Sequence, residues 1–386
     1  MSRQEGLLVR RLATLVGVGI AALIAVGNLA AGGPVAASGR PDPGRAIAAA
    51  RSRSAGPAGE VAGPASSGGT FFVDDGLLFA GNTPPTTNGV SRPHYSVSVI
   101  DVATGRLVGT LGAKADAFVR PMPAGAAGGD VFVMDSGDAY GGEGMTALQA
   151  ATGKLLWTNA SSSAGFGPRS PVCLAVSGGH LYVMESPSNG YAGETVELDA
   201  ATGKLVRTLY GPSFSDHEYS CTLLVDGPDM ISASFQSVVE LDLATGRVLR
   251  IFPEYATPVA VSGPYLFAST HKGGLVELDL ATGKLLRTFP FSDVALVAAG
   301  PDVFALGDTN GAYGSPVVIE IDTATGSSLR TLVGPSAKLP LNGVNSMAIG
   351  DGVLELGVFV VQQGGSASTF FQVNATTGRI ERSFRA

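Results

Sequence analysis

Charged residues are scarce in this chain, and so are cysteine, tryptophan and histidine. Asp, Glu, Lys and Arg make up 15% of the 386 residues, beside two cysteines, one tryptophan and four histidines. The 25 basic residues are outnumbered by 32 acidic ones and form no basic run beyond the N-terminus, which disfavours nucleic-acid binding. No zinc spacing, phosphate loop or Ser-His-Asp order stands out. We therefore expect neither a metal nor a cofactor.

Glycine, in contrast, is abundant with 54 residues, and one short phrase recurs seven times. The clearest copy, at residues 275–289, reads LVELDLATGKLLRTF. Its turn glycine recurs every 37 to 52 residues, at Gly105, Gly153, Gly203, Gly246, Gly283, Gly326 and Gly378. A loose period in this range, with strand-like alternation inside each unit, indicates a β-propeller rather than a helical solenoid.

Each repeat divides into four predicted strands. The unit that ends at Phe289 has strands at 259–261, 265–269, 275–279 and 285–289, separated by turn residues. The same division begins at Phe71 and ends with residues 380–384. The fold prediction is all-β, a seven-bladed propeller of four-stranded antiparallel blades over residues 68–386. We expect the ring to close between complete first and last blades, unless residues 60–67 add a strand.

The N-terminus has the features of an export signal. Three arginines precede an apolar stretch at residues 12–31, and a small-residue segment at 35–38 follows it. Residues 1–37 are predicted to be a signal peptide cleaved after Ala37, with an uncleaved membrane anchor at 12–31 as the alternative. Residues 38–67 have the composition of a flexible, disordered linker. Both interpretations place the propeller in a secreted or extracytoplasmic location. The protein would contact a membrane only through the N-terminal segment, if that segment is not cleaved.

The repeated Asp-x-Ala-Thr-Gly sequence has a mechanical explanation. An Asp side chain accepts hydrogen bonds from turn amides, and Gly takes the positive φ that a tight strand connection needs. The aspartates of this turn are therefore predicted to be structural and not to bind metal: Asp101, Asp199, Asp242, Asp279 and Asp322.

Four glutamates precede an arginine by ten residues, symmetrically about the turn glycine. Opposite residues on paired strands can touch, so we predict cross-strand ion pairs on the surface, each worth at most about 1 kcal/mol. The alternative is that these charged side chains are simply solvated at the outer edge of the blades, without pairing. The predicted pairs are Glu197–Arg207, Glu240–Arg250, Glu277–Arg287 and Glu320–Arg330.

The segment Ala150-Ala151-Thr152-Gly153-Lys154-Leu155-Leu156-Trp157 resembles the tryptophan-docking repeat of pyrroloquinoline-quinone (PQQ)-type propellers. The other copies resemble both that repeat and the YVTN-type surface-layer propellers, over residues 70–386. The resemblance implies the fold and is weak for activity, because such repeats occur in dehydrogenases, assembly factors and binding scaffolds alike. Quinone dehydrogenases of this kind have eight blades, a calcium site and adjacent cysteines, features that this sequence does not match.

The two cysteines fall near the start of the innermost strand in the third and fourth repeats. An exported protein meets oxidising conditions, so a disulfide between Cys173 and Cys221 is one interpretation. Two buried thiols are the other.

The candidate binding surface is built from loops. In a propeller the loops between the second and third strands (B–C loops), and those between blades (D–A loops), open on one face, and here they are the long and irregular ones. Three B–C loops each carry an acid followed by a tyrosine, which can supply recognition contacts; the alternative is shared ancestry and turn chemistry. The candidate residues are Asp135, Asp138 and Tyr140; Glu185 and Tyr191; and Asp308 and Tyr313.

The D–A connection Asp216-His217-Glu218-Tyr219 concentrates ionisable groups. Proton transfer needs a partner positioned by the fold, and no companion motif specifies one, so His217 and Glu218 enter as binding candidates and no catalytic residue is assigned. The functional hypothesis is an exported, noncatalytic scaffold, monomeric, that recognises a protein or cell-envelope partner through these loops. The alternative is an extracytoplasmic lyase, lactonase or other hydrolase with a metal-assisted site at the propeller axis.

Overall fold

The computed structural model divides the chain into two units, residues 1–40 and 41–386, and the described residues all belong to the second. The description covers residues 71–74, 76–82, 96–112, 121–135, 144–160, 171–185, 195–209, 221–234, 237–252, 255–270, 274–289, 292–300, 302–308, 316–333, 344–350, 352–362 and 365–385. The predicted signal peptide, the anchor alternative and the linker therefore lie outside the described residues.

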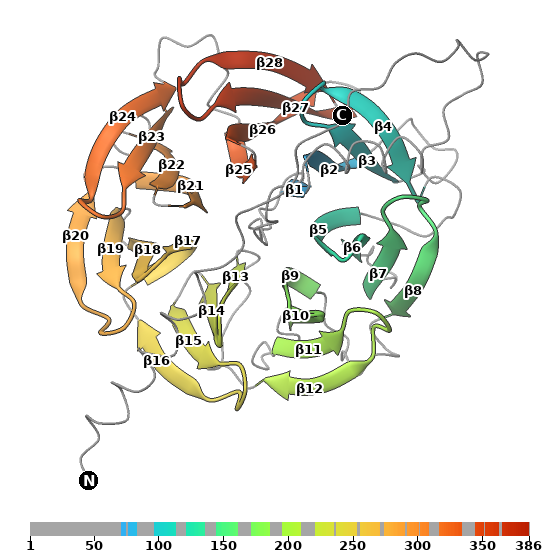
Figure 1. Ribbon diagram of the computed structural model, residues 1–386, viewed down its shortest axis with the longest axis horizontal. Helices are drawn as coiled ribbons and strands as arrows, with labels where there is room; N and C mark the ends of the chain where they lie inside the picture. The colour runs from blue at the N-terminus through green and yellow to red at the C-terminus, as the bar shows by residue number, and fades with distance from the viewer. Residues whose placement is uncertain are drawn as a thin grey trace, which may run out of the picture. The chain divides into compact units, whose positions relative to one another are not determined.

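The described chain forms seven four-stranded antiparallel sheets, each built from four consecutive strands (Figure 1). Blades 1 to 3 comprise β1 (Phe71–Asp74), β2 (Leu77–Asn82), β3 (Ser96–Asp101), β4 (Arg106–Leu111); β5 (Pro121–Ala127), β6 (Asp130–Asp135), β7 (Gly144–Gln149), β8 (Leu155–Ala160); β9 (Pro171–Ser177), β10 (His180–Glu185), β11 (Thr195–Asp199) and β12 (Leu205–Leu209).

Blades 4 to 7 repeat the same order. They comprise β13 (Cys221–Asp226), β14 (Asp229–Ser234), β15 (Val238–Asp242), β16 (Val248–Phe252); β17 (Tyr255–Ser262), β18 (Tyr265–Thr270), β19 (Leu275–Asp279), β20 (Leu285–Phe289); β21 (Ser292–Ala299), β22 (Asp302–Asp308), β23 (Pro316–Asp322), β24 (Ser327–Val333); β25 (Val344–Gly350), β26 (Val353–Gln362), β27 (Gly365–Asn374) and β28 (Ile380–Arg385).

The blades form a closed ring. The innermost strands contact one another in the order β1, β5, β9, β13, β17, β21 and β25, and β25 contacts β1 again. Because blades 1 and 7 each consist of four consecutive strands, the ring closes between two complete blades, as the repeat pattern predicted. Residues 60–67, the proposed source of an extra strand, lie outside the described residues.

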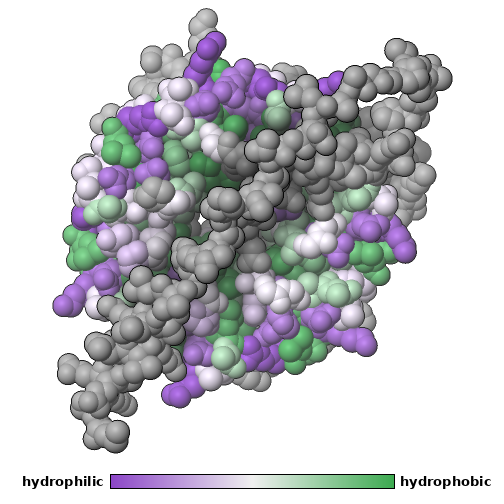
Figure 2. All heavy atoms as spheres, in the orientation of Figure 1, coloured by the Kyte–Doolittle hydropathy of each residue, from purple (hydrophilic) through white to green (hydrophobic). Residues whose placement is uncertain are grey.

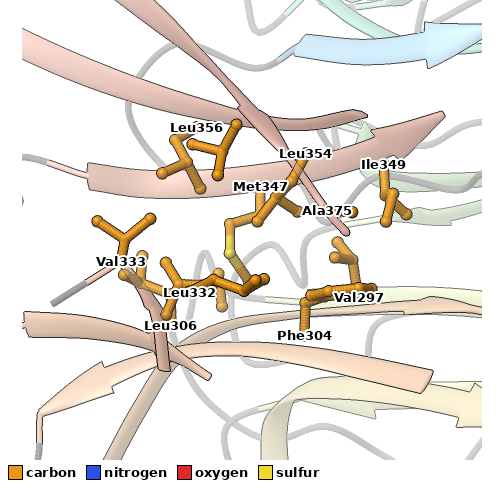
Figure 3. Close-up of a cluster of buried hydrophobic side chains, with 13 residues drawn as sticks. Val297, Phe304, Leu306, Leu332, Val333, Met347, Ile349, Leu354, Leu356 and Ala375 are labelled. Atoms are coloured by element: carbon orange, nitrogen blue, oxygen red, sulfur yellow. The ribbon is translucent and has the colours of Figure 1, made fainter. Parts of the chain in front are cut away.

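The hydrophobic core is divided into seven parts, one between each pair of neighbouring blades. Each sheet is covered on both faces, so its middle strands carry almost continuous apolar runs, as in the fully buried Leu275, Val276 and Leu278 of β19. Figure 3 shows one such part, where Met347 of β25 packs among side chains of blades 6 and 7, including Leu332 and Leu354.

The turn between the third and fourth strands is alike in all blades. The turn glycines have φ values between 63° and 70°, a region that favours glycine. In blade 5, Asp279 Oδ1 accepts hydrogen bonds from Thr282 N and Thr282 Oγ1, both at 2.7 Å. The other four aspartates accept equivalent turn hydrogen bonds, and Gln149 and Asn374 substitute for Asp in blades 2 and 7. The structural interpretation of these aspartates is confirmed.

Candidate functional site

The second strand of every blade ends on one face of the ring, because each blade is an antiparallel meander that begins at its inner strand. The ends of the second and fourth strands, and the starts of the first and third strands, therefore lie on that face. The final residues of the second strands are all polar: Asn82, Asp135, Glu185, Ser234, Thr270, Asp308 and Gln362. Three of the seven are acids, and all three are predicted binding residues.

The order of the blades decides which of these acids are neighbours. Asp135 ends a strand of blade 2 and Glu185 a strand of blade 3, and these two blades are adjacent. Asp308 belongs to blade 6, separated from them by two blades in either direction. The remaining candidates lie outside the described residues: Asp138, Tyr140, Tyr191, Tyr313, His217 and Glu218. Their convergence into one surface thus stays a prediction.

Cys173 lies in β9, the innermost strand of blade 3, and it is disulfide-bonded. Cys221 is the first residue of β13, the innermost strand of blade 4, which contacts β9. Because the chain has only two cysteines, we propose that this bond joins Cys173 to Cys221 and crosses the seam between the two blades.

Charged side chains link the two outer strands in four of the blades. All four predicted ion pairs are present, for example Arg207 Nε to Glu197 Oε2 at 2.5 Å and Arg287 Nη1 to Glu277 Oε2 at 2.8 Å. The pairs Arg330–Glu320 and Arg250–Glu240 have N–O distances of 2.5 and 3.7 Å. The pairing that the ten-residue spacing predicted is confirmed.

Their predicted surface location was wrong. Glu277 is fully buried, and the other three glutamates are also buried, whereas the arginines are partly exposed. Burial raises the pKa of Glu277 and of Glu240, and the neighbouring arginine opposes that rise in each case. The repeat pattern located the pair but did not show that neighbouring blades cover the carboxylate.

Three of these arginines also connect their blade to the next one. Arg207 of blade 3 donates to Ala244 O at 2.8 Å and to Leu243 O, both in the turn of blade 4. Arg250 makes the same contacts with Ala281 and Leu280 of blade 5, and Arg330 with Ala375 and Thr376 of blade 7. In blade 2, Trp157 occupies this position, and its Nε1 donates to Ala200 O at 2.9 Å.

The turn glycine has a second role that the sequence did not reveal. A Cβ added to Gly203 would lie 2.6 Å from Trp157 Cε3, and one added to Gly326 would collide with the guanidinium of Arg287. The glycine thus leaves room for the large side chain of the preceding blade. The ten-residue spacing shared by the arginines was the available signal, but only the ring shows which turn each side chain reaches.

The last blade closes the ring with different residues. Gln372 Nε2 lies 2.6 Å from Val102 O in blade 1 and 2.8 Å from Glu355 Oε1 in its own blade. Glu355 is fully buried, and its Oε2 has no hydrogen-bond partner among the described residues. Burial raises the pKa of Glu355 to about 7, against the opposing effects of Gln372 and Arg382. Glu355 was not singled out from the sequence, although the equivalent residues of the other blades are aromatic or aliphatic: Phe79, Phe132, Tyr182, Ile231, Phe267 and Phe304.

The described residues contain no group of three or more His, Cys, Asp or Glu side chains placed to hold a metal ion. They also contain no helix that is long and apolar enough to span a bilayer.

A family model described as "Outer membrane protein assembly factor BamB" matches residues 93–331 and 234–381, well over half of the chain. No curated protein matches the chain.

Three solved structures resemble the fold. The computationally designed Ika8 protein is 17% identical, with a TM-score of 0.54, over 84% of this chain and 87% of its own. BamB from Moraxella catarrhalis is 15% identical, with a TM-score of 0.49, over 85% of this chain and 91% of its own. The WD40 domain of Neurospora crassa Pan2 is 10% identical, with a TM-score of 0.46, over 67% of this chain and 75% of its own.

Proposed function

Because this chain belongs to the PQQ-like propeller family whose model is described as outer membrane protein assembly factor BamB, we propose that it is a noncatalytic assembly scaffold of the cell envelope. The family resemblance seen in residues 150–157 is thereby confirmed. The match to this family model is the observation that carries the proposal. The proposed location is extracytoplasmic, with residues 1–37 as the export signal or anchor.

The proposed contact surface is the face on which the long loops open. Asp135, Glu185 and Asp308 supply acidic positions at the strand ends that lead into three of these loops. The tyrosines of the same loops, Tyr140 and Tyr191 in adjacent blades and Tyr313 in blade 6, would add aromatic anchors. His217 and Glu218 fall in the sequence between β12 and β13, and we propose that this connection contributes to the same face.

The contacts between neighbouring blades suit the proposed role as an assembly scaffold. The arginines and the tryptophan tie each of several blades to the turn of the next, and Gln372 ties the last blade to the first. Such a ring fixes the strands at which the loops begin and end, so binding to the loops would not have to order the frame itself. No observation on the described residues favours the lyase, lactonase or hydrolase hypothesis.

The test is to isolate the envelope partner by cross-linking to the full chain in its own cells and then to measure the affinity of the purified pair. A triple variant, Tyr140→Ala, Tyr191→Ala and Tyr313→Ala, is expected to weaken binding by about tenfold or more. The matched control replaces three exposed leucines of the outer strands, Leu107, Leu285 and Leu329, by alanine. Equal binding by the loop variant and the control, with equal unfolding temperatures, would reject the loop face as the contact surface.

A further inference from the structure

The large aliphatic side chains that are exposed among the described residues lie on one part of the fold. All of them belong to the outermost strands of the blades, where hydrophobic and hydrophilic side chains intermingle along the periphery (Figure 2). They are Leu107, Leu155, Leu156, Leu205, Val206, Val248, Leu249, Ile251, Leu285, Leu286, Leu329 and Ile380.

The outer strand of blade 4 differs from the other six. Five residues after the turn glycine, six blades carry a small hydroxyl residue, whereas blade 4 carries Ile251. The six are Thr110, Thr158, Thr208, Thr288, Thr331 and Ser383. Ile251 is 48% exposed, so packing between blades does not explain why isoleucine replaces threonine here.

Val248 and Ile251 form an apolar pair on one side of β16. Ile251 is opposite Val239 and Val248, 39% exposed, is opposite Leu241; these two β15 residues alternate along their strand and share a side, and the register shift between the two pairs leaves Leu249 unpaired. Val239 belongs to the buried cluster between blades 3 and 4. The pair therefore extends the apolar side of the blade outwards to its edge.

β16 is also the terminal strand of its sheet. It pairs with β15, and no described strand pairs with its other edge. A terminal strand presents N–H and C=O groups that can pair with an added strand, and exposed alternate side chains can contact those of that strand. Arg247, which is exposed, directly precedes β16 and places a positive charge at this end of the edge.

We propose that the outer edge of β16 is a docking site for an extended segment of a protein partner. The segment would add a fifth strand to blade 4, with aliphatic side chains at alternate positions against Val248 and Ile251. A carboxylate at its end would lie opposite Arg247. This site is on the periphery of the ring and is independent of the loop face assigned above.

The test uses a fluorescent synthetic peptide of alternating valine and threonine with an aspartate at each end, and the full chain. Binding is measured by fluorescence anisotropy. The variant Ile251→Thr, which installs the residue of most other blades, should weaken binding by about tenfold through lost apolar contact. The matched control Leu286→Thr, on β20 of blade 5, should bind the peptide as tightly as the unaltered chain does. Thermal unfolding of both variants checks that the fold is retained.

A second peptide, N-methylated at alternate backbone amides, checks the strand pairing and should not bind. The proposal is overturned if the unmodified peptide does not bind, if Ile251→Thr leaves its affinity unchanged, or if N-methylation has no effect. Two further measurements identify other occupants. Dimerisation in analytical ultracentrifugation that disappears in Ile251→Thr would assign the edge to a second copy. Flotation with anionic phospholipid vesicles that disappears in the variant would assign it to a membrane. Either result would overturn the proposed occupant, whatever the loop face binds.

Discussion

The side-chain amide of Gln372 in the last blade donates a hydrogen bond to the backbone carbonyl of Val102 in the first blade, across 2.6 Å. This contact joins residues 270 positions apart in the chain, and the same amide nitrogen also holds the carboxyl of Glu355. Ring closure is reinforced by an edge-to-face contact between Phe71 and Phe370, with ring centroids 4.9 Å apart. The carboxyl of Glu355 at this closure is buried, which disfavours its charged form and raises its pKa.

Glu355 is expected to make stability depend on pH. Its pKa is raised from 4.5 to about 7 in the folded chain, so between these values the folded chain binds more protons than the unfolded chain. The free energy of unfolding should therefore fall as pH rises through this window, by roughly 3 kcal/mol, and then level off.

Urea unfolding at pH 5 and pH 8 measures this dependence. The variant Glu355→Gln should remove most of the fall and be more stable than the unaltered chain at pH 8. Glu381→Gln, on the exposed side of β28, is the control and should keep the full pH dependence. An identical pH profile for Glu355→Gln would show that this carboxyl is not the titrating group.

The arginine contacts between blades are expected to contribute to stability. In Arg330→Ala the chain loses the ion pair with Glu320 and the hydrogen bonds to Ala375 and Thr376, and the buried carboxylate is left without its partner. We expect a loss of roughly 2–3 kcal/mol in the free energy of unfolding, since Arg330 is partly exposed and solvent screens the pair. Arg379→Ala, at the exposed turn of blade 7, should change it by less than about 0.5 kcal/mol. Equal effects of the two substitutions would contradict the bridging role.

A comparison of two glycines separates the energetic cost of a positive φ from the cost of a steric collision. Gly203 and Gly263 both have positive φ, but only at Gly203 would a new Cβ meet other atoms, those of Trp157 and Asn159. Each Gly→Ala substitution should cost about 1–2 kcal/mol for the backbone, and Gly203→Ala about 1–3 kcal/mol more for the collision. Chemical unfolding of both variants measures the difference, which would vanish if Trp157 could move aside freely.

The proposed Cys173–Cys221 bond predicts that reduction destabilises the chain. Closing a loop of this length restricts the unfolded chain, an effect of about 4 kcal/mol in the chain-entropy account. Mass spectrometry of the unreduced protein should find the two cysteine peptides linked, and dithiothreitol should lower the unfolding temperature. The unfolding temperature of Cys173→Ala should be the same with and without dithiothreitol. Recovery of unlinked, alkylatable thiols from the native protein would refute the proposed bond.

Local patterns were enough to predict much of the fold. Alternating apolar residues, turn glycines and the recurring Asp-x-Ala-Thr-Gly sequence depend on neighbours close in the chain, so the strands of residues 265–289 were predicted almost to the residue. The ten-residue spacing likewise identified Glu277 and Arg287 as partners, because a hairpin places opposite residues at a constant separation in sequence. Of the candidate site, the sequence placed Asp135, Glu185 and Asp308 at the start of three similar loops, and the structure has them as the last residues of the strands that lead into those loops.

These local patterns could not predict the contacts between blades. The repeat determined by itself that there are seven blades and where each one turns, because those features arise from hydrogen bonds and side-chain alternation within about 50 residues. Only the tertiary structure decided that Glu277 is buried, that Arg330 reaches the turn of the next blade, and that Gln372 meets Val102. The physical reason is that burial and these hydrogen bonds depend on how one sheet stacks on the next, and the closing contact exists only once the whole ring has formed.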